Sequence, residues 1–198
     1  MKYVTQIIIF VLIVGLVVTF KTLSLSEATY LKSDLTNKEY LVQNLTRKED
    51  ASKILGMVEE RINALKKYLS TNVKKYPDYS QYINQFCSRI GNLVLLENPP
   101  DGKYTSYTVN KGDEIALCLR SRYTHELHDI NLIMYVVIHE LAHVACPEQD
   151  HTELFKKIFK FLLTVTISLG LYKHVDYANN PHEYCGMTIR EDLLKTHM

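Results

Sequence analysis

The stretch VVIHELAHVACPEQDH holds residues whose types and spacing could bind a metal ion. It contains His-Glu-x-x-His, followed after seven further residues by a third histidine, His151. On a helix, residues four apart project from the same face one turn apart, so His139 and His143 can reach one ion. Glu140 points away by about one residue's rotation and can reach a metal-bound water without binding the metal. The pattern therefore predicts a zinc site that lowers the pKa of a bound water toward ~7, with Glu140 as the general base.

A hydrolytic zinc site needs a third protein ligand and one open position. The helix should end at Pro147, and His151 then opens the next helix, where a reversed chain could bring it over the first two histidines. The other candidates for third ligand are Glu153, His174, His182 and Glu183. Glu153 is too close to the motif, and Glu183 lies in an expected loop. The two other histidines are interpreted more simply as surface residues. His151 is therefore the predicted third ligand.

Helices and strands must position this motif. Apolar residues recur at helical spacing from Asp50, and this helix should end before Pro77, with a second helix over residues 80–90. The runs NLVLLENPP, KYTSYTV and EIALCLR are typical of strands, and the last two flank residues 110–113, which indicate a hairpin. A buried helix is expected from about Thr152 to Leu169, ending at Gly170. The tail beyond it reads as loop.

The N-terminus differs in character from the rest of the chain. Eighteen uncharged residues lie between Lys2 and Lys21, and as a helix they would span ~27 Å, close to the hydrocarbon thickness of a bilayer. This length favours a retained transmembrane anchor over residues 1–21 rather than a cleaved signal peptide. Residues 22–49 are polar and lack a clear period, which predicts a stalk. The flanking charges and the sequon at Asn44 weakly favour a single-pass membrane protein with its domain on the non-cytoplasmic side.

These elements together predict an α+β fold. Residues 50–198 would form a mostly helical zincin-like domain with a small antiparallel sheet, preceded by the N-terminal transmembrane helix. The formal net charge is +1 and the lysine pairs are scattered, so no nucleic-acid partner is expected. The four cysteines contain no C-x-x-C, which makes a cysteine-based zinc knuckle unexpected. Cys146 and Cys185 are hypothesised to face each other as a disulfide.

The segment IHELAHVACPEQDHTELF resembles the WLM and SprT-like zinc metallopeptidases, and most of all the short, membrane-anchored members predicted in large DNA viruses. The match extends more weakly from EIALCLR to EYCGM, and only the HExxH core is strongly diagnostic. The resemblance implies that His139, His143 and His151 bind Zn²⁺ and that Glu140 is the base. It also implies that the aromatic residue four positions beyond the last histidine packs beneath the site. The loop before His151 is longer than in the WLM pattern, which is a departure at the third ligand.

The leading interpretation is a membrane-anchored zinc metallopeptidase that hydrolyses a protein or peptide substrate with metal-activated water. Two alternatives stay open: a non-catalytic metal-binding virion or membrane structural protein, and a SprT-like DNA-associated protease. The intact Glu140 favours activity, and the absence of a basic stripe disfavours the DNA-associated role. Tyr184 and Tyr177 are candidate oxyanion stabilisers by chemistry, since a phenol can donate to a developing oxyanion.

Overall fold

The computed structural model describes residues 27–195, together with residues 6, 9, 10, 12, 13 and 15. From the N-terminus the elements are β1 (Ala28–Lys32), β2 (Glu39–Gln43), α2 (Lys48–Asn72), η1 (Val73–Lys75), η2 (Pro77–Tyr79), α3 (Ser80–Arg89), η3 (Ile90–Asn92), β3 (Val94–Asn98), β4 (Tyr107–Val109), β5 (Glu114–Cys118), α4 (Ile130–Ala145), α5 (Glu153–Ser168), β6 (His182–Tyr184) and β7 (Met187–Ile189). The predicted α+β class is confirmed.

The anchor predicted over residues 1–21 lies, apart from the six positions named above, outside the described residues. Within the described part of the chain, no helix combines the length and the apolar character that a membrane span requires. The anchor stays a prediction.

The main sheet has five strands in the order β1-β2-β3-β5-β4. The β1–β2 and β4–β5 pairs are antiparallel, whereas β2–β3 and β3–β5 are parallel. The sheet is thus mixed, and the prediction of a small antiparallel sheet was wrong. Its one predicted pairing, the hairpin around residues 110–113, is present. The parallel pairs were missed because their partners are joined by long connections, which leave no local pattern in the sequence.

Residues 28–43, which the sequence suggested were stalk, belong to the sheet. Their five-residue strands pair in register from Ala28 opposite Gln43 to Lys32 opposite Glu39, and Leu41 pairs with Leu96 of β3. Tyr40 and Val42 are buried in the core. The predicted boundary at residue 50 therefore falls inside the folded unit, because these two strands are completed by contacts distant in sequence.

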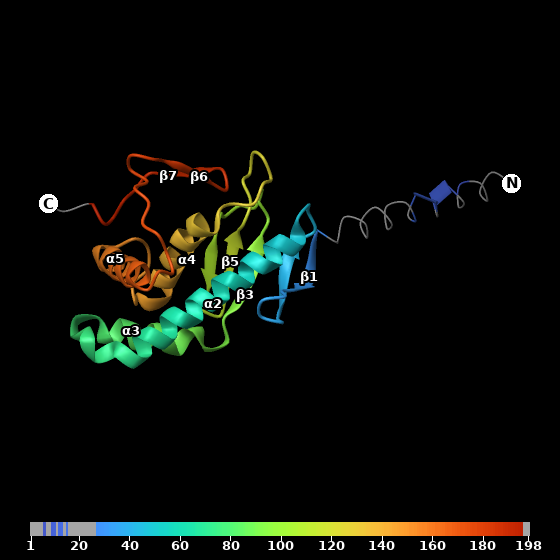
Figure 1. The fold of residues 1–198 in the computed structure, drawn as a ribbon. Helices are drawn as coiled ribbons and strands as arrows, with labels where there is room; N and C mark the ends of the chain where they lie inside the picture. The colour runs from blue at the N-terminus through green and yellow to red at the C-terminus, as the bar shows by residue number, and fades with distance from the viewer. Residues whose placement is uncertain (1–5, 7–8, 11, 14, 16–26, 196–198) are drawn as a thin grey trace.

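The helices supply most of the core. α2 packs on β1, β2 and β3, and α4 packs on β4 and β5, while α2 and α4 also contact each other; Figure 1 shows α2 running across the sheet. The apolar face predicted for the first helix is buried, with Ile54, Leu55, Val58, Ile62, Leu65 and Leu69 all in the core. The predicted inward face of α3 is also buried, at Ile83, Phe86 and Ile90.

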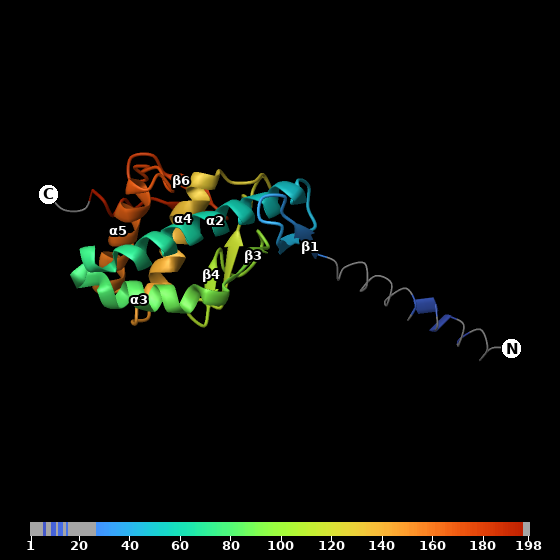
Figure 2. The same cartoon turned by 60° about the horizontal axis from the view of Figure 1, so that its bottom comes forward.

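The helix pair α4 and α5 carries the HExxH motif and the segment that follows it. Asp129 caps α4 by accepting a hydrogen bond from the Asn131 backbone N–H at 2.8 Å, and the helix ends before Pro147, as predicted. Thr152 caps α5 in the same way, and Gly170 follows this helix with a φ of 67°, a conformation that glycine adopts without strain. α5 packs on α4, and Figure 2 shows the pair on the side of the molecule away from β1.

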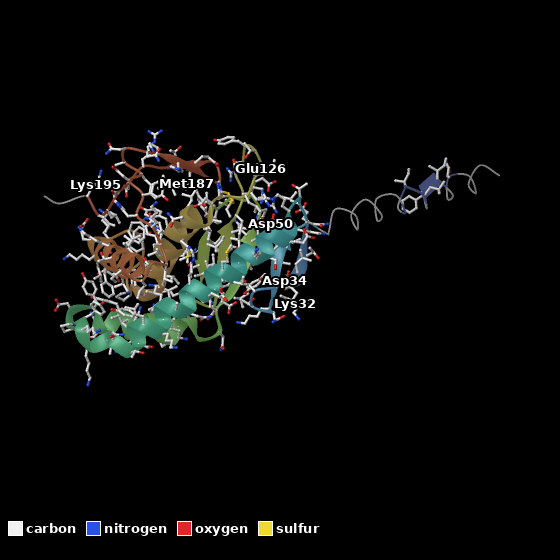
Figure 3. The ribbon with its side chains drawn as sticks, in the orientation of Figure 1. Lys32, Asp34, Asp50, Glu126, Met187 and Lys195 are labelled. Atoms are coloured by element: carbon white, nitrogen blue, oxygen red, sulfur yellow. A yellow bond between two sulfur atoms is a disulfide. The ribbon has the colours of Figure 1, made fainter. Side chains whose placement is uncertain are left out.

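The tail predicted as loop contains a second, two-stranded sheet. Strands β6 and β7 pair antiparallel, and the turn residues Cys185 and Gly186 have φ values of 51° and 82°, as a two-residue type I′ hairpin requires. Met187 marks this hairpin in Figure 3, where it lies above α4.

A disulfide joins Cys118 at the end of β5 to Cys185 in this turn, while Cys146 is free and buried. The hypothesised Cys146–Cys185 bridge was wrong. Cys146 directly follows α4 and is enclosed in the core, whereas the hairpin turn lies over β5.

Candidate metal centre and active-site cleft

The structure brings the three histidines of the motif together. The Nε2 atoms of His139 and His143 lie 3.2 Å apart, and that of His151 lies 3.2 Å from His143 and 3.0 Å from His139. His139 and His143 lie one turn apart on α4, and the reversal of the chain before α5 brings His151 over them. Among the described residues, these three form the one cluster of histidine, cysteine or carboxylate side chains with a geometry that could hold a metal ion.

This triangle of nitrogens fits a metal ion and does not fit a hydrogen-bond network. A ring Nε2 either carries a hydrogen or offers a lone pair, so three such atoms cannot all donate to and accept from one another. Tetrahedral zinc with Zn–N distances of about 2.0–2.1 Å separates its nitrogen ligands by about 3.3 Å. The observed separations of 3.0–3.2 Å are close to that value. The donor set is therefore compatible with zinc.

The electrostatics of the cluster keep its lone pairs available. Burial, followed by the neighbouring imidazoles, lowers the pKa of His139 to about 3. Burial, followed by His151 and the charge of Lys111, lowers the pKa of His143 to about 4. Both rings are therefore neutral near pH 7, which is the form that binds metal.

One aromatic ring, that of Phe155, packs against all three histidines of the cluster. The Phe155 ring stacks on His143 with centroids 4.2 Å apart and meets the rings of His139 and His151 edge-on at 5.0 and 4.9 Å. Phe155 follows His151 by four positions, so the predicted packing of an aromatic residue beneath the site is confirmed. The ring restricts the orientation of all three imidazoles.

Glu140 projects into the same cleft. Its side chain is buried, with 6% of the residue exposed, and Thr108 of β4 donates a hydrogen bond to Oε2 at 2.8 Å. Burial raises the pKa of Glu140 to about 7, and the bond from Thr108 opposes this rise. A carboxyl group with a pKa near neutrality can both take up and release a proton under physiological conditions. The role of Thr108 was missed from the sequence, although the predicted hairpin placed it next to the motif.

A cleft of about 970 Å³ opens over these groups. Its lining includes residues 104–108 together with Tyr184 and residues 187–191 of the hairpin segment, and Ser106 and Tyr184 are in direct contact. The lining also includes His139, Glu140, His143 and His151. The cleft is large enough to enclose several residues of an extended peptide.

The two tyrosines considered as oxyanion stabilisers lie in different places. Tyr184 lines the cleft, is 1% exposed, and its hydroxyl lies 2.6 Å from Ser106 Oγ. Burial, with a further contribution from the charge of Glu140, raises its pKa above the ordinary value. Tyr177 is absent from the lining of the cleft and packs against Tyr135 at 4.9 Å. The structure thus places Tyr184 at the site and Tyr177 in the core.

The other candidates for third ligand lie outside the cluster. His174 contacts Asp192 at 3.0 Å, and His182 Nδ1 lies 2.8 Å from the Asn180 carbonyl oxygen. Glu183 accepts a bond from the Gly186 backbone N–H, and Glu153 pairs with Lys156 on the surface of α5. The geometry therefore singles out His151.

The fold and site define a class: an α+β protein whose HExxH helix and following histidine form one cluster with a geometry that could hold a metal ion, which is the arrangement predicted from the WLM and SprT-like resemblance. The chain matches no established family profile. It is 59% identical over 190 residues to uncharacterized protein R325 of Acanthamoeba polyphaga mimivirus, which covers 96% of each chain. The chain therefore belongs to the same family as this mimivirus protein.

A second viral protein and two solved structures are also similar to the chain, with lower identity. Uncharacterized protein 136R of Invertebrate iridescent virus 6 is 33% identical over 121 residues, or 60% of this chain and 64% of that protein. Two crystal structures of Wss1 from Saccharomyces cerevisiae, one of them a mutant, are similar to the chain with 21% and 23% identity and a TM-score of 0.49 each. They cover 65% and 66% of this chain, and 89% and 92% of Wss1. At this TM-score the similarity supports no conclusion about activity.

Proposed function

We propose that the protein is a zinc metallopeptidase that hydrolyses peptide bonds in the cleft lined by the histidine cluster, β4 and the β6–β7 hairpin. The observation that carries the proposal is the triangle of Nε2 atoms from His139, His143 and His151, with the buried Glu140 carboxylate in the same cleft. Three histidines leave a fourth position open on a tetrahedral ion, as hydrolysis requires. A bound zinc ion would supply an activated water and polarise the scissile carbonyl.

The residues of the chain have separate tasks in this reaction. Glu140 takes a proton from the attacking water and returns it to the leaving amine. Thr108 orients the Glu140 carboxylate through its 2.8 Å hydrogen bond. The Tyr184 hydroxyl, held by Ser106, lies in the wall of the cleft and is the proposed donor to the oxygen on which negative charge develops.

The substrate is proposed to be an extended protein or peptide segment. β4 is an edge strand of the main sheet, and residues 104–108 around its start line the cleft. An extended peptide can pair with such an edge through backbone hydrogen bonds, while alternate side chains enter neighbouring pockets. This mode of binding depends little on the sequence of the substrate, and the side-chain preference is set by the walls.

The direct test measures metal content and proteolysis of the full-length chain. The expected result is one zinc per chain by elemental analysis and cleavage of an unfolded protein such as casein, which a chelator abolishes and added zinc restores. His151→Ala should bind zinc more weakly and lose cleavage. Wild-type protein that binds no zinc would overturn the proposal.

A matched control uses a histidine outside the cluster. His174→Ala changes a side chain that contacts Asp192 and should leave zinc stoichiometry and cleavage unchanged. Wild-type protein that binds zinc but cleaves no substrate would instead support the alternative of a non-catalytic metal-binding structural protein. The membrane anchor, and with it a location on the non-cytoplasmic side, stays a separate proposal that glycan occupancy of Asn44 would test.

A further inference from the structure

The segment that leads to the third histidine, residues 146–150, is held by a lysine from another part of the fold. The Nζ of Lys111 donates hydrogen bonds to the backbone carbonyls of Cys146, Pro147 and Glu148 at 2.9, 2.9 and 3.0 Å. An ammonium group has three donors and no acceptor. All three donors are therefore used on consecutive carbonyls of this segment, which we call the ligand loop.

The turn that carries Lys111 is built to approach the end of α4. Gly112 has a φ of 131°, and a Cβ there would lie 3.2 Å from Val144 Cγ1 and from the Arg89 Cβ and carbonyl oxygen. Only glycine combines this conformation with so close an approach. Arg89 reinforces the same region by donating to the Val144 carbonyl at 2.7 Å. The β4–β5 turn is thus packed directly on the C-terminal end of the motif helix.

His151 has few constraints of its own. It is exposed, unlike His139 and His143, and it follows Asp150, whose φ of 60° is a left-handed conformation unusual for a residue other than glycine. Its position depends on the path of the ligand loop and on the edge-on contact with Phe155. A cation at the end of α4 also interacts favourably with the helix dipole, so Lys111 could in principle act on the helix alone.

We propose that Lys111 is a positioning residue for the metal centre: it fixes the ligand loop so that His151 meets His139 and His143. This inference rests on the proposed function, because it concerns the third ligand of the same zinc site. It explains how the chain accommodates seven residues between His143 and His151. The charge and the three donors of Lys111 hold this seven-residue connection in place from outside it.

The test measures zinc affinity of the full-length chain by competition with a chromophoric chelator. Lys111→Met retains the length of the side chain without its charge or donors and should lower zinc affinity by about 10–100-fold, the range typical of groups that orient metal ligands. Lys111→Gln, which keeps a single amide donor group, should fall between this variant and the wild type. Arg61→Met is the matched control, because Arg61 donates to the Leu171 carbonyl beyond α5 in a comparable way and should leave zinc affinity unchanged.

A double-mutant cycle separates positioning of His151 from stabilisation of the helix. If Lys111 acts through His151, Lys111→Met should have no further effect on zinc affinity in a His151→Ala background. The cobalt(II) form of Lys111→Met should also show weaker visible bands than the wild type, as loss of a histidine from a tetrahedral site would cause. Unchanged zinc affinity in Lys111→Met, or an equal loss with and without His151, would overturn the inference. A wild-type chain that binds no zinc would instead overturn the proposed function as well.

Discussion

The two sides of the cleft are built in different ways. The metal side consists of α4, the ligand loop and the start of α5, and its reactive groups lie within the seventeen-residue stretch from His139 to Phe155. The opposite side joins residues 104–108 to the β6–β7 hairpin through the Ser106–Tyr184 hydrogen bond and the Cys118–Cys185 disulfide. These partners lie 78 and 67 residues apart in the sequence.

This difference separates the groups that bind the metal from the groups that contact the substrate. Helix periodicity and one chain reversal bring the three histidines close together within a short stretch of sequence, and Lys111 is the proposed contact from outside that stretch. The walls that contact substrate depend on cross-links between distant segments. We therefore expect changes on the metal side to alter metal binding and catalysis. Changes on the hairpin side, which carries the proposed oxyanion donor Tyr184, should leave metal binding intact and alter substrate affinity, turnover and folding stability.

The largest effect is expected from removal of a ligand. His143→Ala should lower zinc affinity by more than about 100-fold, the upper end of what loss of an orienting group alone causes, and should reduce peptide cleavage below detection. His174→Ala, which changes a histidine that contacts Asp192, is the control and should retain both. Chelator competition and a peptide-cleavage assay measure the two quantities. Full zinc affinity in His143→Ala would contradict the metal assignment.

A smaller effect on zinc affinity is expected when the disulfide that joins the β6–β7 hairpin to β5 is removed. The double variant Cys118→Ala/Cys185→Ala should lower the free energy of unfolding by about 2–4 kcal/mol, because the disulfide closes a long loop. Zinc affinity should stay within about threefold of the wild type, while KM for a peptide rises more than kcat falls. Urea unfolding and steady-state kinetics measure these changes.

The control for the disulfide variant is Cys146→Ala, which changes a free cysteine and should leave KM unchanged. If the double variant lost zinc as readily as a ligand variant, the two sides of the cleft would not be separable.

An effect confined to the metal-free chain concerns the buried Glu140. Its pKa is raised to about 7 in the folded state, so the folded state retains a proton that the unfolded state loses as pH rises above its ordinary pKa. The group therefore destabilises the fold increasingly between pH 4.5 and 7. Glu140→Gln should stabilise the chelator-treated protein by about 3 kcal/mol at pH 8 and by less than about 1 kcal/mol at pH 5. Denaturant titrations at the two pH values measure this, and an equal difference at both would argue against burial as the cause.

The sequence predicted the metal side of the cleft well, because its signals are periodic and local. The apolar face of α2, the helix stop at Pro147, the end of α5 at Gly170 and the aromatic residue after His151 are all found in the structure. His151 was also chosen among five candidates for third ligand, by chain reversal and by elimination of the other four, and its ring lies with those of His139 and His143 in the structure. The helical period and the breaking residues carry enough information for these features.

The other side could not be predicted in the same way. Strands β1 and β2 have an alternating segment, EYLVQ, that was open to interpretation as a strand, but their position in the sheet depends on partners after α3. The Cys185-Gly186 pair indicates a two-residue turn, yet no local signal shows that Cys185 pairs with Cys118 and not with Cys146. Thr108 and Lys111 act on residues 32 and 35 or more positions away, so their roles became visible only with the fold.

The most direct test of the central claim compares zinc content and peptide cleavage in wild-type and Glu140→Gln full-length protein at pH 7. If the three histidines bind the metal and Glu140 is the base, the variant should retain one zinc per chain while kcat falls by about 10²–10⁴-fold. Loss of zinc in Glu140→Gln, or cleavage at the wild-type rate with zinc bound, would contradict the proposed division between ligands and base.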